Sequence, residues 1–184
     1  MDVSDEEQAT GFVKDAAGEL GGLHILVNNA GLMLLGPVSD QTTDDWRRMV
    51  GVNLLGLLYC THAALPLMAR AGGGDIVNVS SVAGRRADAG AAVYNMTKFG
   101  VHAFSEALRQ EALHVGVRVT VVAPGLVDTA MSTGWEAAYE LWNTKSPMRR
   151  PAQPADIADM VWALIANPYV TGEVVIVDGG LNLT

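Results

Sequence analysis

Four short, largely apolar runs, each followed by glycine or polar residues and separated from the next by a longer stretch, constrain the fold of this chain most strongly. They lie at 23–27, 75–81, 117–122 and 173–177. Apolar runs of this length are typical of strands buried on both faces of a parallel sheet. Strands that alternate with helices form such a sheet through right-handed crossovers, with helices on both faces. The sequence therefore predicts a doubly wound α/β fold, as one domain over residues 1–184.

The stretches between the runs carry helix signals. Polar and acidic residues favour a helix start near Thr43, and the glycines at 72–74 end that helix after about Arg70. A second helix is expected over 91–114 and a third over 154–166, where proline stands in the first turn. The stretch 128–154 has no regular pattern and is longer than an ordinary loop, which favours a lid or substrate loop over a surface insertion.

Polar or glycine residues follow each predicted strand, at Asn28-Asn29, Ser80-Ser81, Pro124-Gly125 and Asp178-Gly179. Any one of these pairs could be an ordinary turn. In doubly wound sheets, however, ligands bind outside the carboxyl ends of the strands. The sequence therefore predicts a ligand site at this edge of the sheet.

Tyr94 and Lys98 are four positions apart, so they lie on one face of the predicted helix over 91–114. A phenol has an ordinary pKa of about 10, and a nearby ammonium group favours its anionic form. When it is protonated, the same phenol can donate its proton to a substrate carbonyl. The pair is a candidate acid/base site, although this spacing also occurs by chance in many helices.

Two polar residues stand where they could join this pair. Ser81 ends a predicted strand, where its hydroxyl could hydrogen-bond a substrate oxygen or simply form a strand-end turn. Asn53 is an amide within an apolar helical turn, so it needs a partner if it is buried. A water that also bonds Lys98 is one such partner, and bulk solvent is the alternative.

These motifs, in their order and spacing, resemble those of the short-chain dehydrogenase/reductase family, whose members are NAD(P)-dependent oxidoreductases with a Rossmann-like sheet. The matching residues are Asn28-Asn29-Ala30-Gly31, Asn53, Ser81, Tyr94 with Lys98, and Pro124-Gly125. The resemblance implies that Tyr94 is the acid/base and that Lys98 lowers its pKa and holds the nicotinamide ribose. It also implies that Ser81 orients the substrate and that Asn53 orders a water.

The resemblance further implies NADP or NAD as the cofactor, with NADP slightly favoured. Asp2 and Val3 resemble the pair that contacts the adenine, and Thr129 resembles the residue that contacts the carboxamide. The remaining implied cofactor contacts are Asn28, Ala30 and Gly31 at the adenosine ribose, and Pro124, Gly125 and Val127, with Tyr94 and Lys98, at the nicotinamide side.

One part of the family's pattern is missing. Members begin with a strand and a glycine-rich turn that receives the cofactor pyrophosphate, and no glycine motif of this chain follows a strand in that way. Gly18, Gly21 and Gly22 precede a strand and are interpreted as the end of a helix. At roughly 30 residues per strand–helix unit, about 60 residues are expected to be absent before Met1. The chain is therefore interpreted as N-terminally truncated, with an exposed sheet edge.

Charge and residue pattern argue against several other classes of function. A net charge of −8 and a pI near 4.8 argue against a nucleic-acid partner. Apolar runs are expected to be interrupted before the ~20 residues of a membrane span, and the acidic start does not fit a signal peptide, so a cytoplasmic protein is expected. The histidines lack the spacing of metal ligands, so no metal is expected, and Cys60 is expected in the core.

Two functions follow as hypotheses. The first is an oxidoreductase that interconverts a ketone or aldehyde and an alcohol, with a small carbonyl or alcohol compound as its substrate. The second is an inactive remnant that acts only through the two long helices, which resemble the oligomer-interface helices of the family. Both hypotheses predict a homodimer or homotetramer, and a monomer in sedimentation would contradict that prediction.

Overall fold

The structure, a computed structural model, describes residues 1–183 and contains one parallel sheet. Its strands follow the order of the chain: β1 (Ile25–Asn28), β2 (Gly74–Val79), β3 (Val117–Pro124) and β4 (Val174–Val177). Each neighbouring pair is parallel, with Val27 opposite Val77 in the first pair and Ala123 opposite Ile176 in the last. All the carboxyl ends therefore meet at one edge of the sheet.

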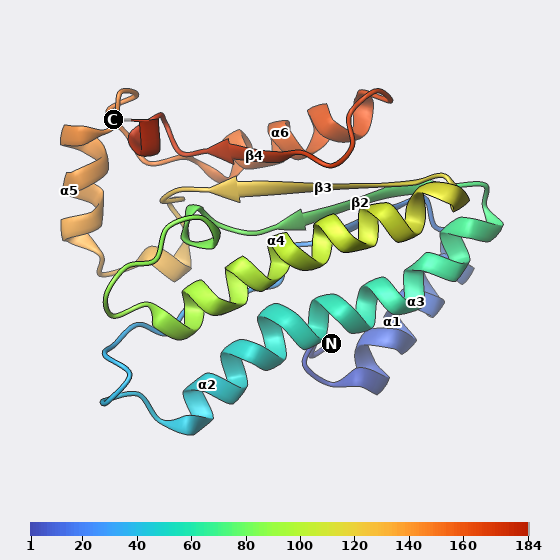
Figure 1. Cartoon of the computed structure of the whole chain (residues 1–184), viewed down its shortest axis with the longest axis horizontal. Helices are drawn as coiled ribbons and strands as arrows, with labels where there is room; N and C mark the ends of the chain where they lie inside the picture. Colours follow the sequence, from blue (N-terminus) through green and yellow to red (C-terminus); the bar gives the residue numbers. More distant parts are fainter. Residues whose placement is uncertain (184) are drawn as a thin grey trace.

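Helices cover both faces of this sheet. They are α1 (Glu6–Leu20), α2 (Thr43–Val50), α3 (Gly56–Arg70), α4 (Ala92–Ala112), α5 (Glu136–Lys145) and α6 (Pro154–Ala166). Figure 1 shows α1, α3 and α4 against one face of the sheet and α6 against the other, whereas α5 stands beyond the carboxyl ends of β3 and β4. The predicted doubly wound α/β fold is confirmed.

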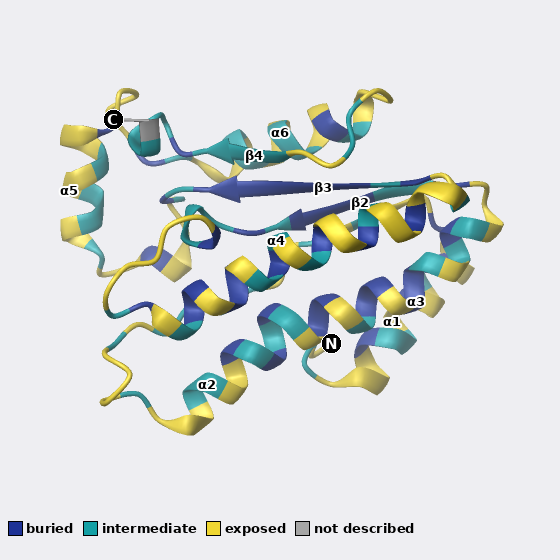
Figure 2. Cartoon of the chain, viewed as in Figure 1, coloured by how far each residue is buried: buried dark blue, intermediate teal, exposed yellow. Residues whose placement is uncertain are grey.

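The larger hydrophobic core lies between the sheet and the layer of α1, α3 and α4. Alanines at positions 9, 63 and 64 let α1 and α3 approach closely, and Ile76 and Val119 cover them from the sheet. Cys60 belongs to this core, as predicted, and its burial raises the pKa of the thiol. A smaller core lies beneath α6, and Figure 2 shows β2 and β3 buried between the two layers.

The helix predicted over 43–70 exists, but it changes form in the middle. A capping box starts α2, since the Asp45 N–H donates to Thr42 Oγ1 at 3.1 Å and the Thr42 N–H donates to Asp45 Oδ2 at 3.1 Å. A π-helical turn over Gly51–Leu55 then joins α2 to α3. Turns of this kind are rare in proteins as a whole, and those that exist often lie at functional sites. This one carries Asn53.

Glycines, at positions 51 and 56, rather than charged residues interrupt the apolar stretch of this continuous helix. The stretch 49–69 contains no Asp, Glu, Lys or Arg. By length and composition, Thr43–Arg70 could cross a membrane, with a mean hydropathy of 1.5 over its most apolar window. Core helices of globular proteins pass the same test, and here 44% of the window is buried, with Ala64 and Met68 packed in the larger core.

The stretch 128–154 is only partly irregular, so its prediction was wrong in part. It contains a 3-10 turn over Ala130–Ser132 and the ten-residue helix α5. Of the glycines before β1, Gly21 ends a helix, as predicted: it adopts a left-handed conformation with φ of 73° at the end of α1. The prediction was wrong for Gly18, which lies inside α1.

Strand β1 forms an edge of the sheet. Ile25 and Val27 are 43% and 39% exposed there, although strands of a doubly wound sheet are usually covered on both faces. Parallel pairing with β2 satisfies only one side of this strand. The edge therefore presents apolar side chains and backbone groups to its surroundings.

Candidate active site

Tyr94 and Lys98 lie on one face of α4 and turn toward the end of β2. The Lys98 Nζ donates a hydrogen bond to the backbone carbonyl of Val79 at 3.1 Å and lies 5.8 Å from the centre of the Tyr94 ring. Both side chains are buried, at 7% and 5% exposure. The helix thus holds a phenol and an amine beside the strand tip that leads into Ser81.

The environment of Tyr94 favours the protonated phenol. Burial raises its pKa above the ordinary value, whereas a hydrogen-bonding contact with the Ser81 side chain acts in the opposite direction. Ser81 Oγ also accepts a hydrogen bond from the Ala83 N–H at 3.1 Å, which fixes the position of the hydroxyl. The side chains predicted to act at the substrate oxygen, Ser81 and Tyr94, therefore meet in the structure.

Burial also makes the charged form of Lys98 less favourable. It lowers the pKa of the ammonium from 10.5 to about 8, so that the group is charged at neutral pH and loses its proton under mildly alkaline conditions. A Cβ atom at Gly31 would lie 3.8 Å from Lys98 Nζ and 3.7 Å from Asn53 Oδ1. Glycine at position 31 thus leaves open the space directly beside the amine, which suits the close approach of a cofactor sugar.

Asn53 makes direct protein contacts with its whole side-chain amide. Its Oδ1 accepts from the Leu32 N–H at 2.7 Å, and its Nδ2 donates to the Leu32 carbonyl at 2.8 Å and to Thr97 Oγ1 at 3.0 Å. The side chain therefore clamps the segment after Gly31 onto α4. A water ordered by this residue stays a prediction.

Asn28 joins a buried chain of hydrogen bonds behind the site. Its Nδ2 donates to Asn78 Oδ1 at 2.8 Å and to Thr61 Oγ1 at 3.1 Å, and Asn78 Nδ2 donates to Ser105 Oγ at 2.9 Å. These contacts tie β1 to β2, α3 and α4. Contact of Asn28 and the exposed Ala30 with the adenosine ribose stays a prediction.

The segment after β3 is held from two sides. Val127 pairs with Ala152 in an isolated parallel bridge, and the Thr129 N–H donates to Ser132 Oγ at 3.2 Å. Gly125 donates its N–H to the Val177 carbonyl at 3.0 Å, so that Pro124 and Gly125 lie against the end of β4. This segment is the predicted nicotinamide side of the site.

We expect Gly125→Ala to destabilise the protein by about 1–3 kcal/mol, because an added methyl overpacks this position. Its Cβ would lie 2.9 Å from Trp142 Cζ2 and 3.1 Å from the backbone Cα of Asp178. Gly11→Ala is the matched control, since a Cβ there meets nothing within 4 Å and alanine favours the middle of α1. Urea unfolding should give opposite signs for the two variants, and equal midpoints would contradict the packing argument.

Asp2 and Val3 lie at the start of the helical layer. Asp2 Oδ1 accepts hydrogen bonds from the Ser4 N–H at 2.9 Å and the Ser4 hydroxyl at 2.7 Å, which lower the pKa of the exposed carboxyl. Val3 packs against Gly56, where a Cβ would come within 2.9 Å of it. Val3 thus lies against the first residue of α3, and the contact of Asp2 and Val3 with an adenine stays a prediction.

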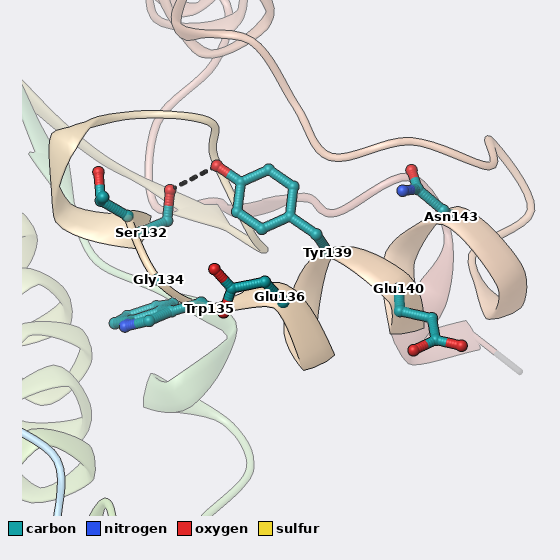
Figure 3. A pocket seen from close by; sticks show the side chains of 8 residues that line it. Ser132, Gly134, Trp135, Glu136, Tyr139, Glu140 and Asn143 are labelled. Atoms are coloured by element: carbon teal, nitrogen blue, oxygen red, sulfur yellow. Dashed lines mark hydrogen bonds between the residues drawn. The ribbon is translucent and has the colours of Figure 1, made fainter.

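A hydrogen-bond network that the sequence did not reveal holds α5 in place. The Tyr139 hydroxyl donates to Asp128 Oδ1 at 2.6 Å and lies 2.9 Å from Ser132 Oγ, and Figure 3 shows Ser132 and Tyr139 facing each other. At the other end of the helix, Trp142 Nε1 donates to the Asp178 carbonyl at 3.2 Å. Tyr139 follows Asp128 by eleven residues through an irregular turn, a spacing that matches no periodic pattern.

Two open cavities flank this region and share Trp135. One, of about 500 Å³, lies between the 3-10 turn and α5, and the other, of about 480 Å³, lies between the loop after β1 and the residues that follow Thr129. The second is lined by Met33, Leu34, Leu35, Gly36, Asp40, Gln41, Asp45, Met131 and Trp135. Trp135 thus contributes to the lining of both cavities.

The charged residues that line the two cavities are all acidic. The residues around them include Asp40, Asp45, Glu136 and Glu140, and none is a lysine, arginine or histidine. Within residues 1–183, no group of three or more His, Cys, Asp or Glu side chains is placed to hold a metal ion.

A parallel α/β sheet with a buried tyrosine and lysine beside a partly exposed serine at its carboxyl edge defines the class of NAD(P)-dependent oxidoreductases of this fold. The family model described as enoyl-(acyl carrier protein) reductase matches residues 1–182. The chain belongs to the short-chain dehydrogenase/reductase family, and it is an oxidoreductase with NAD(P) as its cofactor.

Three relatives illustrate this assignment. A protein named as a candidate ketoacyl reductase 2 of the granaticin polyketide synthase of Streptomyces violaceoruber is 38% identical over 99% of this chain and 75% of its own length. Carbonyl reductase family member 4 of Xenopus tropicalis is 35% identical over 99% of this chain and 76% of its own. The structure of a gluconate 5-dehydrogenase from Burkholderia cenocepacia, in complex with NADP and tartrate, matches all of this chain and 74% of its own with a TM-score of 0.94 at 27% identity.

Proposed function

We propose that this protein reduces the carbonyl group of a small, uncharged ketone or aldehyde, with Tyr94 as the proton donor. The observation that carries the proposal is the contact of the Tyr94 phenol with the Ser81 hydroxyl. The Lys98 amine lies near the same phenol, 5.8 Å from the centre of the Tyr94 ring. Burial keeps the phenol protonated at neutral pH, which is the form that a carbonyl reduction consumes.

Each side chain has one role in this reaction. Ser81 hydrogen-bonds the substrate oxygen, and Tyr94 gives that oxygen its proton as the negative charge develops. Lys98 places a positive charge beside the phenol that has lost its proton and holds the ribose of the cofactor. When bound, the nicotinamide cofactor supplies the hydride. The cofactor would be held by Lys98, Tyr94 and residues 28–31 and 124–129. Asn53 orders a water next to the lysine.

The cavity lining supports an uncharged, partly apolar substrate. Leu34, Met131 and Trp135 offer apolar surface, whereas the carboxylates of Asp40 and Glu136 would repel an anion. One wall of the second cavity follows the segment that Asn53 holds against α4, and the other wall is formed by the residues after Thr129. Both of its walls thus continue from segments of the candidate active site.

The test is titration of the purified protein with NADPH and NADH, followed by turnover with ethyl acetoacetate and with acetoacetate. We expect nucleotide binding and a kcat/KM for the neutral ester about ten-fold or more above that for the anion, because the like charges repel. Added salt should narrow the difference. No nucleotide binding at millimolar concentration would contradict the proposal and favour an inactive protein.

An inactive protein that acts through its helices is the second candidate. Exposed apolar residues on α3 and α4 favour it, since Leu58, Met96 and Phe99 are 37%, 56% and 43% exposed. The same surface supports a homodimer or homotetramer in either case. We further propose a cytoplasmic protein without a membrane or nucleic-acid partner.

A further inference from the structure

Asn95, the residue after Tyr94, concentrates its hydrogen bonds on one short segment. It is 3% exposed, and its Nδ2 donates to the carbonyls of Ala83 at 2.7 Å and Arg86 at 2.9 Å. Its Oδ1 accepts from the Asp88 N–H at 3.2 Å. Both ends of the amide are therefore used on the connection between β2 and α4.

This connection decides where Ser81 stands. Ser81 and Tyr94 belong to different elements, and the chain between them runs through a 3-10 turn over Val82–Gly84 and then through exposed residues at 85–89. Ser81 Oγ accepts the Ala83 N–H at 3.1 Å, so the hydroxyl moves with Ala83. Asn95 grips the carbonyl of that same Ala83 from the helix that carries Tyr94.

We infer that Asn95 is a positioning residue for the reaction: its amide fixes the segment that presents Ser81, so that the Ser81 hydroxyl faces the Tyr94 phenol. The inference rests on the proposed function, because it deepens the account of the same site. Without the Asn95 amide, the carbonyls of Ala83 and Arg86 and the N–H of Asp88 lose their hydrogen-bond partner. Water can take the place of that partner only if the segment shifts.

A double-mutant cycle on the full chain separates this role from a general effect on folding. We expect Asn95→Ala to lower kcat for ketone reduction about 10- to 100-fold, because a misplacement of about 1 Å can cost 100-fold. The KM for NADPH should change less than about two-fold, because the substitution leaves unchanged the interactions that bind the cofactor equally in the ground state and the transition state. In a Ser81→Ala background, Asn95→Ala should lower kcat by no more than about two-fold, because residues that act through one another are not additive.

Thr171→Val is the matched control. Thr171 Oγ1 bonds the Val119 backbone at the amino end of the sheet, at 3.3 and 3.4 Å, so its loss affects stability without touching the segment at Ser81. We expect an unchanged kcat for this variant. Equal, additive losses of kcat for Asn95→Ala in the wild-type and Ser81→Ala backgrounds would overturn the inference.

A second measurement does not depend on turnover or on the folding of the alanine variant. Asn95→Asp keeps the size and the acceptor of the side chain but loses both donated hydrogen bonds. Amide hydrogen exchange of Ala83 should accelerate at least about ten-fold in this variant and stay unchanged in Thr171→Val. Unchanged exchange at Ala83 would overturn the inference. If the wild-type protein reduces no carbonyl, the proposed function fails, and this exchange measurement still decides whether Asn95 positions Ser81.

Discussion

Turnover of the Tyr94→Phe variant is expected to fall about 1000-fold or more, since a positioned proton donor contributes roughly 10²- to 10⁴-fold to the rate. Phenylalanine keeps the buried ring, which is 7% exposed, and it removes only the hydroxyl that meets Ser81. The affinity for NADPH should therefore stay within about two-fold of the wild type. Steady-state kinetics and a fluorescence titration measure the two quantities.

The matched control for this prediction is Tyr169→Phe, because Tyr169 is 98% exposed and lies after α6. Its turnover should equal that of the wild type. Retention of more than a tenth of the wild-type kcat in Tyr94→Phe would remove the tyrosine from the proposed mechanism, whatever the affinity for the cofactor.

The Lys98→Met variant should lose activity and gain stability. Loss of the amine removes the charge beside the phenol, and we expect kcat to fall about 100-fold or more. Burial lowers the pKa of Lys98 to about 8, so the charged amine destabilises the folded protein at neutral pH. Methionine removes that penalty but also the hydrogen bond to the Val79 carbonyl, so we expect a net gain on the order of 1–3 kcal/mol at pH 7.

The sign of the pH dependence follows from the depressed pKa. Below pH 8 the lysine is protonated in both the folded and the unfolded chain, and the penalty is fully present. Between about pH 8 and 10.5 the unfolded chain holds the extra proton, so the wild-type protein recovers stability as the pH rises. The advantage of Lys98→Met in urea unfolding should therefore shrink from pH 7 to pH 10. A variant that is less stable than the wild type at pH 7 would show that the amine stabilises the fold.

Local signals in the sequence were sufficient for most of the sheet and its helices. The helix predicted over 154–166 is α6 to the residue, because proline in the first turn and a capping box mark its start. The run 117–122 is the core of β3, whose β-branched residues suit a strand buried on both faces. The parallel orientation of the strands followed from their alternation with helices.

The parts that could not be predicted depend on contacts between distant residues. The π-helical turn at Gly51–Leu55 changes the hydrogen-bond spacing without changing the apolar pattern of the helix. Helix α5 has no side-chain cap at Trp135, and its place is set by Asp128 and Asp178. The partners of Asn53, namely Leu32 and Thr97, lie 21 and 44 residues away. In the candidate site, the sequence identified that Ser81, Tyr94 and Lys98 converge but not which other atoms they contact.

Trp135 lines two spaces of about 500 and 480 Å³. A smaller residue at this position would enlarge both spaces, while Tyr94, Lys98 and Ser81 keep their contacts. The breadth of compounds accepted by such a scaffold can therefore change by one substitution on the far side of the reacting groups. Divergence of substrate range within the family then needs no redesign of its chemistry.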